Sequence, residues 1–66
     1  MSAGLLIAEA DADLRRLYEL LSSKLGFLVE TAGDGLECWS KLKARSPEAL
    51  VIDAEIPWGG GDGVAG

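Results

Sequence analysis

Residues 49–63, ALVIDAEIPWGGGDG, contain a short apolar run that ends in an aspartate, followed closely by a proline and three glycines. The run from Ala49 to Ile52 has no polar alternation, which is typical of a parallel strand covered on both faces. Burial of the Asp53 carboxylate would be costly unless the strand delivers it to a polar site. The stretch therefore predicts a buried strand that presents Asp53 at the edge of a sheet.

Two more strand patterns precede this run, and helical patterns separate the three. Residues 5–8 form a compact apolar run, and residues 27–31, FLVET, are rich in residues that favour strands. Between them, apolar residues recur at helical spacing: Leu14, Leu17, Tyr18, Leu21 and Leu25. A second helical pattern follows residue 34, with apolar positions at Leu36, Trp39 and Leu42. Strands that alternate with helices run parallel with right-handed crossovers, so the sequence predicts an α/β fold.

Aspartates, a glycine and a proline mark the expected ends of the two helices. Asp11 or Asp13 can cap the first helix, and Gly26 stands where a left-handed residue would end it. Asp34 is expected to cap the second helix, which should end before Pro47.

Carboxylates follow the first and the third predicted strand. Glu9, Asp11 and Asp13 come after the first strand, and Asp53 and Glu55 after the third. Because parallel strands point their carboxyl ends to one edge, these groups should converge there. Clustered oxygen ligands suit Mg²⁺, which needs only one or two protein carboxylates. Alternatively, Asp11 and Asp13 serve only as helix caps, an interpretation that we favour for Asp13.

The composition excludes several functional classes. A net charge of −5 argues against a nucleic-acid surface, and the basic residues are better explained as solvated helix faces. No apolar run could span a membrane, and no secretory signal is visible, so we expect a cytoplasmic protein. Without histidine, Ser-His and Cys-His nucleophiles are excluded. The single cysteine, Cys38, is expected to be a small buried or half-buried group.

Three segments, taken in order, resemble the N-terminal half of a bacterial response-regulator receiver domain. They are LLIAEADADLRRLYELLSSKLGF, VETAGDGLECWSKL and PEALVIDAEIPWGGGDG. The resemblance to this CheY-like family runs from about Leu5 to Gly63. It implies a flavodoxin-like parallel sheet, here a partial βαβαβ unit with strand order 2-1-3. Residues 1–66 would form a single partial receiver domain that ends in the loop toward a third helix.

The resemblance also implies a function, that of a phosphoacceptor in two-component signalling rather than an enzyme. Asp53 would accept a phosphoryl group from a histidine kinase or a phosphotransfer protein, in a Mg²⁺-dependent reaction, and would act on an output domain or partner protein. Glu9, Asp53 and the backbone carbonyl of Glu55 would hold the metal. The family places a second acid where this chain has Ala10, which is expected to weaken the metal site or abolish it unless another oxygen compensates.

A full receiver has five strands, and the half that is absent here would hold a Ser/Thr and a Lys that act on the phosphoryl group. The third strand would then be an apolar edge that invites self-association. Two alternatives to a phosphorylated receiver stay open. One is a degenerate pseudo-receiver used only for protein interaction, and the other is a truncated fragment without switching of its own.

Overall fold

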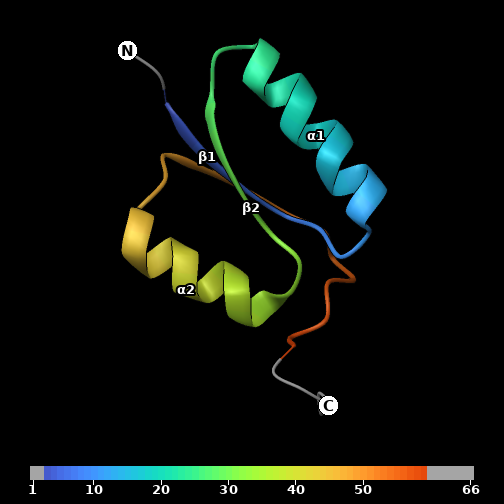
Figure 1. Ribbon diagram of the computed structural model, residues 1–66. Coiled ribbons are helices and arrows are strands. Elements are labelled where there is room, and N and C mark those ends of the chain that lie inside the picture. Colours follow the sequence, from blue (N-terminus) through green and yellow to red (C-terminus); the bar gives the residue numbers. More distant parts are fainter. Residues whose placement is uncertain (1–2, 60–66) are drawn as a thin grey trace.

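Three parallel strands form the centre of the fold, and a helix connects each strand to the next (Figure 1). The computed structural model describes residues 3–59. The elements are β1 (Gly4–Ala8), α1 (Ala12–Lys24), β2 (Leu28–Ala32), α2 (Gly35–Arg45) and β3 (Ala49–Ile52). The predicted element order and the predicted strand order, β2-β1-β3, are both confirmed. The expected Asp62–Gly63 turn and the start of a third helix lie outside the described residues.

The register of the sheet brings the carboxyl ends of all three strands level with one another. Ala8, the last residue of β1, pairs with Ala32 at the end of β2 and with Ile52 at the end of β3. Because the strands are parallel, whatever follows these three residues must emerge at the same edge. That edge carries Glu9 and Asp53.

The two helices lie on opposite sides of the sheet (Figure 1). The chain steps from β1 to β2 in one direction across the sheet and returns past β1 to reach β3. Connections of the same hand therefore place the two helices on opposite faces. Neither helix within residues 3–59 is long and apolar enough to cross a membrane.

Alternation along β1 divides its apolar side chains between the two faces. Leu6 and Ala8 are almost fully buried and form a core with Ala32 and Cys38, against which Leu42 and Ile56 pack. This core lies under α2. Leu5 and Ile7 point to the opposite face, the one that α1 covers, and are also buried. The burial of Cys38 confirms its predicted role.

The predicted helix ends are confirmed, but the preferred interpretation of Asp13 as a helix cap is wrong. Asp11 is the N-cap of α1, and its carboxylate accepts hydrogen bonds from the amides of Asp13 at 2.9 Å and Leu14 at 3.2 Å. Asp13 is therefore not the cap but a residue of the first turn. Gly26 follows the helix with a φ of 99°, the left-handed conformation that glycine adopts without strain.

The second helix begins and ends where the sequence indicates. The carboxylate of Asp34 accepts a hydrogen bond from the amide of Glu37 at 2.7 Å. At the other end, Ser46 is left-handed with a φ of 48°, and Pro47 follows it. The residue before a proline avoids the α-helical conformation, which accounts for the position of this helix end.

The prediction that β3 is covered on both faces is wrong for the described part of the chain. Leu50, Val51 and Ile52 are 40–51% exposed. Among residues 3–59, only β1 pairs with this strand, and neither α1 nor α2 packs against it. The apolar face of α1 is likewise incompletely covered, and none of its residues is buried. An apolar pattern indicates that a strand is suited to burial, but it does not show which elements, if any, cover the strand.

Candidate functional site

The site is built on the ends of two neighbouring strands. The amide of Asp53 donates a hydrogen bond to the carbonyl of Ala8 at 3.0 Å, extending the β1–β3 ladder by one residue. On the other side, the amide of Glu9 donates to the carbonyl of Ala32 at 3.0 Å. Regular backbone pairing therefore fixes the positions of Glu9 and Asp53 relative to each other. The convergence that the sequence predicts for these two residues is confirmed.

Glu9 and Asp53 border one pocket of about 470 Å³ on the α1 side of the sheet. The rest of its wall is largely apolar and includes Leu14, Tyr18 and Val51. A polar end on an otherwise apolar hollow is a common arrangement for a binding site. Glu9 and Asp53 thus both line one recess at this edge of the sheet.

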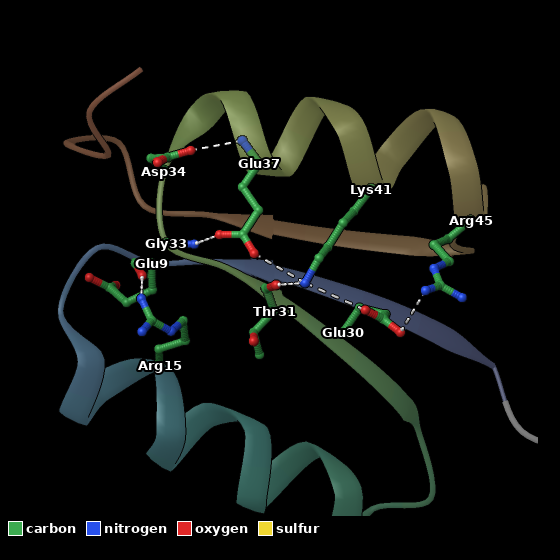
Figure 2. A network of polar contacts seen from close by, with 9 residues as sticks. All are labelled: Glu9, Arg15, Glu30, Thr31, Gly33, Asp34, Glu37, Lys41 and Arg45. Atoms are coloured by element: carbon green, nitrogen blue, oxygen red, sulfur yellow. Dashed lines mark hydrogen bonds and ion pairs between the residues drawn. The ribbon is translucent and has the colours of Figure 1, made fainter. Parts of the chain in front are cut away.

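The carboxylate of Glu9 is held by the start of α1. Its side chain is buried, with the residue only 7% exposed, and Oε2 accepts a hydrogen bond from the amide of Asp11 at 3.1 Å. The backbone carbonyl of Glu9 accepts a hydrogen bond from Nη1 of Arg15 at 2.9 Å, as Figure 2 shows. Arg15 therefore fixes the turn that follows β1. Sequence reasoning did not identify this contact, because no short motif signals a side chain reaching back to a strand end.

Asp53 begins a tight turn. Its Oδ1 accepts a hydrogen bond from the amide of Glu55 at 3.1 Å, and its carbonyl accepts one from the amide of Ile56, also at 3.1 Å. An aspartate that bonds to the backbone two residues on is a common way to fix a turn. The Asp53 side chain is half-buried, while Glu55 and Ala54 are exposed. One carboxylate oxygen of Asp53 thus has a fixed role within the turn.

The oxygen donors at this edge suit a hard cation in their chemistry. Mg²⁺ takes one or two protein carboxylates and keeps several waters, and Glu9 and Asp53 border the same pocket. Ala10 is exposed and contributes no side-chain oxygen. Among residues 3–59, no group of three or more acidic, cysteine or histidine side chains is arranged to hold a metal. Binding of Mg²⁺ by Glu9, Asp53 and the carbonyl of Glu55 stays a prediction.

A separate network of charges joins α2 to β2 (Figure 2). Nζ of Lys41 lies 2.6 Å from the carbonyl oxygen of Thr31, 3.3 Å from a Glu37 oxygen and 3.6 Å from a Glu30 oxygen. Arg45 lies 3.9 Å from the second oxygen of Glu30. Lys41 and Arg45, together with Arg15, are three of the chain's basic residues, and all three have partners within the fold. That this segment makes no nucleic-acid contact stays a prediction.

Glu37 connects this network to the loop before α2. Its Oε1 accepts a hydrogen bond from the amide of Gly33 at 2.9 Å, and this bond, aided by Lys41, lowers the pKa of Glu37 below its ordinary value. The carboxylate of Asp34 in turn accepts the hydrogen bond from the Glu37 amide. The Asp-x-x-Glu spacing resembles a capping box, so the sequence did carry a signal for this pair.

Cys38 lies in the core beside Ala8 and Ala32 and not at the site. Burial raises the pKa of its thiol, which keeps it protonated at neutral pH. The thiolate is the nucleophilic form of cysteine, so burial lowers the nucleophilicity of this residue.

Curated relatives of the chain include two response-regulator proteins. Protein RcaC of Microchaete diplosiphon is 36% identical over 52 residues, which are 79% of this chain and 8% of RcaC. The probable transcriptional regulator ycf27 of Guillardia theta is 32% identical over 59 residues, 89% of this chain and 23% of that protein. No protein-family model and no solved structure matches the chain.

The chain spans less than a quarter of the length of either relative. Both matches nevertheless cover most of this chain, and the structure has the parallel β2-β1-β3 order that the resemblance implied. Sequence, fold and relatives agree. The relatives support a receiver domain of the response-regulator type, and the structure is a partial, flavodoxin-like α/β unit.

Proposed function

We propose that this chain is the receiver module of a two-component phosphorelay and that Asp53 is its phosphoacceptor. One observation carries the proposal: Asp53 follows the end of β3 and borders the same pocket as Glu9, with both positions fixed by backbone pairing to β1 and β2. The response-regulator relatives support the receiver role in general.

The reaction would be a transfer between a phosphohistidine and an aspartate. The Asp53 carboxylate attacks phosphorus, an acyl phosphate forms, and the bond from phosphorus to the histidine nitrogen breaks, leaving neutral imidazole after proton uptake. The amide of Glu55 holds Oδ1 of Asp53, which leaves Oδ2 as the attacking atom. Mg²⁺, when bound by Glu9, Asp53 and the Glu55 carbonyl, would offset the negative charge of the transferred group.

This proposal includes the partners and the compartment. The donor would be a histidine kinase or a phosphotransfer protein, and the signal would pass to an output domain or a partner protein. We place the chain in the cytoplasm and assign it a signalling role in place of classical enzymatic turnover. No contact with nucleic acid is proposed for this segment, because its net charge is −5.

Ala10 supports a second candidate function, that of a pseudo-receiver. With alanine at this position, the edge of the sheet has one carboxylate fewer to bind Mg²⁺ than the family pattern. Because less Mg²⁺ would be bound, the negative charge of an incoming phosphoryl group would be less well offset. In this case the fold would serve only to bind a partner protein.

Acetyl phosphate with Mg²⁺ distinguishes the two functions. The wild-type chain should gain a phosphoryl adduct in intact-mass spectra, and Asp53→Asn should abolish it. Asp13→Asn is the matched control, because Asp13 is an exposed aspartate in the first turn of α1. An adduct that persists in Asp53→Asn would contradict the assignment. If the wild type gains none and Ala10→Asp does, the pseudo-receiver is correct.

A further inference from the structure

The segment after Asp53 completes the N-terminal cap of α2. The first amides of a helix have no partners within the helix and need external acceptors. In α2, the amide of Gly35 donates to the carbonyl of Pro57 at 2.7 Å, and that of Leu36 donates to the carbonyl of Trp58 at 2.6 Å. In α1, by comparison, the local carboxylate of Asp11 accepts from two such amides by itself. The start of α2 thus depends on a segment more than twenty residues away in sequence.

The contact between these two segments is close enough to require glycine at two positions. A Cβ on Gly35 would lie 2.8 Å from Cε3 of Trp58 and 3.3 Å from its Cα. A Cβ on Gly59 would overlap the carboxyl group of Asp34, and Gly59 has a left-handed φ of 91°. Figure 1 shows the orange-red segment after β3 running past the start of α2. We call the contact of residues 57–59 with residues 34–36 the α2 dock.

The α2 dock is tightly connected to Asp53. Only three residues separate Asp53 from Pro57, and the turn between them is closed by the Ile56 amide and the Asp53 carbonyl at 3.1 Å. The Ile56 side chain packs against the core beneath α2. Because the connection is short and hydrogen-bonded, a displacement of Pro57 and Trp58 should also move the Asp53 turn.

We propose that Gly35 is a positioning residue for Asp53. Its missing side chain lets residues 57 and 58 dock on the first turn of α2, and the dock holds the turn in which Asp53 presents its carboxylate. The proposed consequence for phosphoryl transfer rests on the function proposed above. The structural coupling from Gly35 through Trp58 to Asp53 does not depend on that function. Coupling of this kind is reciprocal, so a group bound at Asp53 also changes the stability of the first turn of α2.

The test is Gly35→Ala in the full chain, with amide hydrogen exchange followed residue by residue by NMR. Helix propensity alone favours alanine over glycine, so without a dock the substitution should be harmless. With the dock, the Leu36 amide loses its acceptor, and its exchange should become about tenfold faster. The Ile56 amide, which closes the Asp53 turn, should become faster as well.

Two further variants make the result decisive. Gly4→Ala is the matched control. A Cβ there would lie 3.1 Å from the flexible end of Glu48 and 3.7 Å, an ordinary contact distance, from Cα of Pro47. Because Gly4 is at the opposite end of the sheet, this substitution should change neither amide. Trp58→Ala in the Gly35→Ala background removes most of the clash and should restore protection at Ile56. If Gly35→Ala unfolds the chain, this double variant should refold it, and continued unfolding would overturn the inference.

Unchanged exchange at Leu36 in Gly35→Ala would show that no dock exists. Faster exchange at Leu36 with unchanged exchange at Ile56 would show that the dock does not position Asp53. Either result overturns the inference.

Failure of the proposed function has a different signature, the absence of an adduct in the wild type after acetyl phosphate treatment. The two exchange measurements are interpretable in either case. If the wild type is phosphorylated, Gly35→Ala should lower its adduct yield several-fold, and Gly4→Ala should not.

Discussion

Glu9 and Asp53 emerge side by side from two hydrogen-bonded strands and border a single pocket. Their proximity results from parallel pairing, since Ala8 lies opposite Ile52 and the Asp53 amide donates to the Ala8 carbonyl. The two residues come from positions 44 apart in sequence and reach the same edge without any special loop. A change in charge at this edge should therefore be felt directly at the candidate site.

Replacement of Ala10 by aspartate should strengthen Mg²⁺ binding. The attraction between a carboxylate and each unit of positive charge about 4 Å away is about 1 to 4 kcal/mol near a protein surface. Because Mg²⁺ carries two such charges, we expect its binding affinity to rise at least about tenfold. Tryptophan emission during a Mg²⁺ titration measures it, in a Trp39→Phe background that leaves Trp58 as the reporter. Ala10→Asn is the control, since it adds an oxygen without charge and should gain much less. Equal affinities for Ala10→Asp and the chain that keeps Ala10 would place the cation elsewhere.

Stability should depend on the ionisation of Glu37. The hydrogen bond from Gly33 and the nearby Lys41 lower the pKa of this carboxyl below 4.5, so the folded state favours its charged form. Its contribution is then complete above the ordinary pKa and is lost as the pH falls through the lowered value. Because Glu37 is exposed, Glu37→Gln should cost at most about 1 kcal/mol at pH 7 and less near pH 3.

Urea unfolding of the wild type and Glu37→Gln at both pH values measures this difference. Glu19→Gln on α1 is the control, since Glu19 lies outside the network of Glu30, Glu37 and Lys41. A difference that grows toward acid pH would have the wrong sign and would contradict the interpretation of Glu37.

The core under α2 should tolerate very little loss of volume. Leu6 is 1% exposed and packs in the core that contains Ala8, Ala32 and Cys38. Leu6→Ala should cost about 2–5 kcal/mol, which is comparable with the whole stability of so small a domain. Circular dichroism should show loss of the cooperative melt. Leu20→Ala is the control, because Leu20 is 50% exposed on α1 and should change stability little. A native-like melt for Leu6→Ala would show that this core does not hold the fold.

Pairing of two copies through β3 should be weak at low salt and stronger at high salt. Within residues 3–59, β3 has one unpaired edge, but Glu48 and Asp53 flank it. In a symmetric antiparallel pair centred between Leu50 and Val51, Glu48 of one copy lies opposite Asp53 of the other, and like charges opposite each other are destabilising. Sedimentation over a range of salt concentrations measures the fraction of dimer. Val51→Lys, which places a charge on the edge strand, should keep the chain monomeric. A wild type whose dimerisation weakens with added salt would contradict this account.

The sequence was sufficient for the elements that depend on local pattern. Periodicity separated the two helices from the three strands, and the capping role of Asp34 followed from short-range chemistry. The choice between Asp11 and Asp13 as the cap of α1 did not, because both aspartates stand near the start of that helix. The parallel order then placed Glu9 and Asp53 at one edge, because topology alone determines which ends converge. These features require no knowledge of side-chain packing.

Contacts between distant segments could not be predicted in the same way. The reach of Arg15 to the Glu9 carbonyl and the dock of Trp58 on Gly35 depend on the distance between separate elements, which no spacing in the sequence encodes. The exposure of β3 has the same origin. The apolar residues of β3 indicate a strand suited to burial. They do not indicate whether another element covers the strand within residues 3–59.

Mapping the phosphorylated residue tests the central claim most directly. After treatment with acetyl phosphate and Mg²⁺, borohydride reduces an aspartyl phosphate to homoserine, which peptide mass spectrometry can locate. The account predicts homoserine at position 53 in the wild type, and none at that position in an untreated sample or in Asp53→Asn. Reduction at Glu9 or at another acid, with Asp53 intact, would contradict the assignment of Asp53 as the phosphoacceptor.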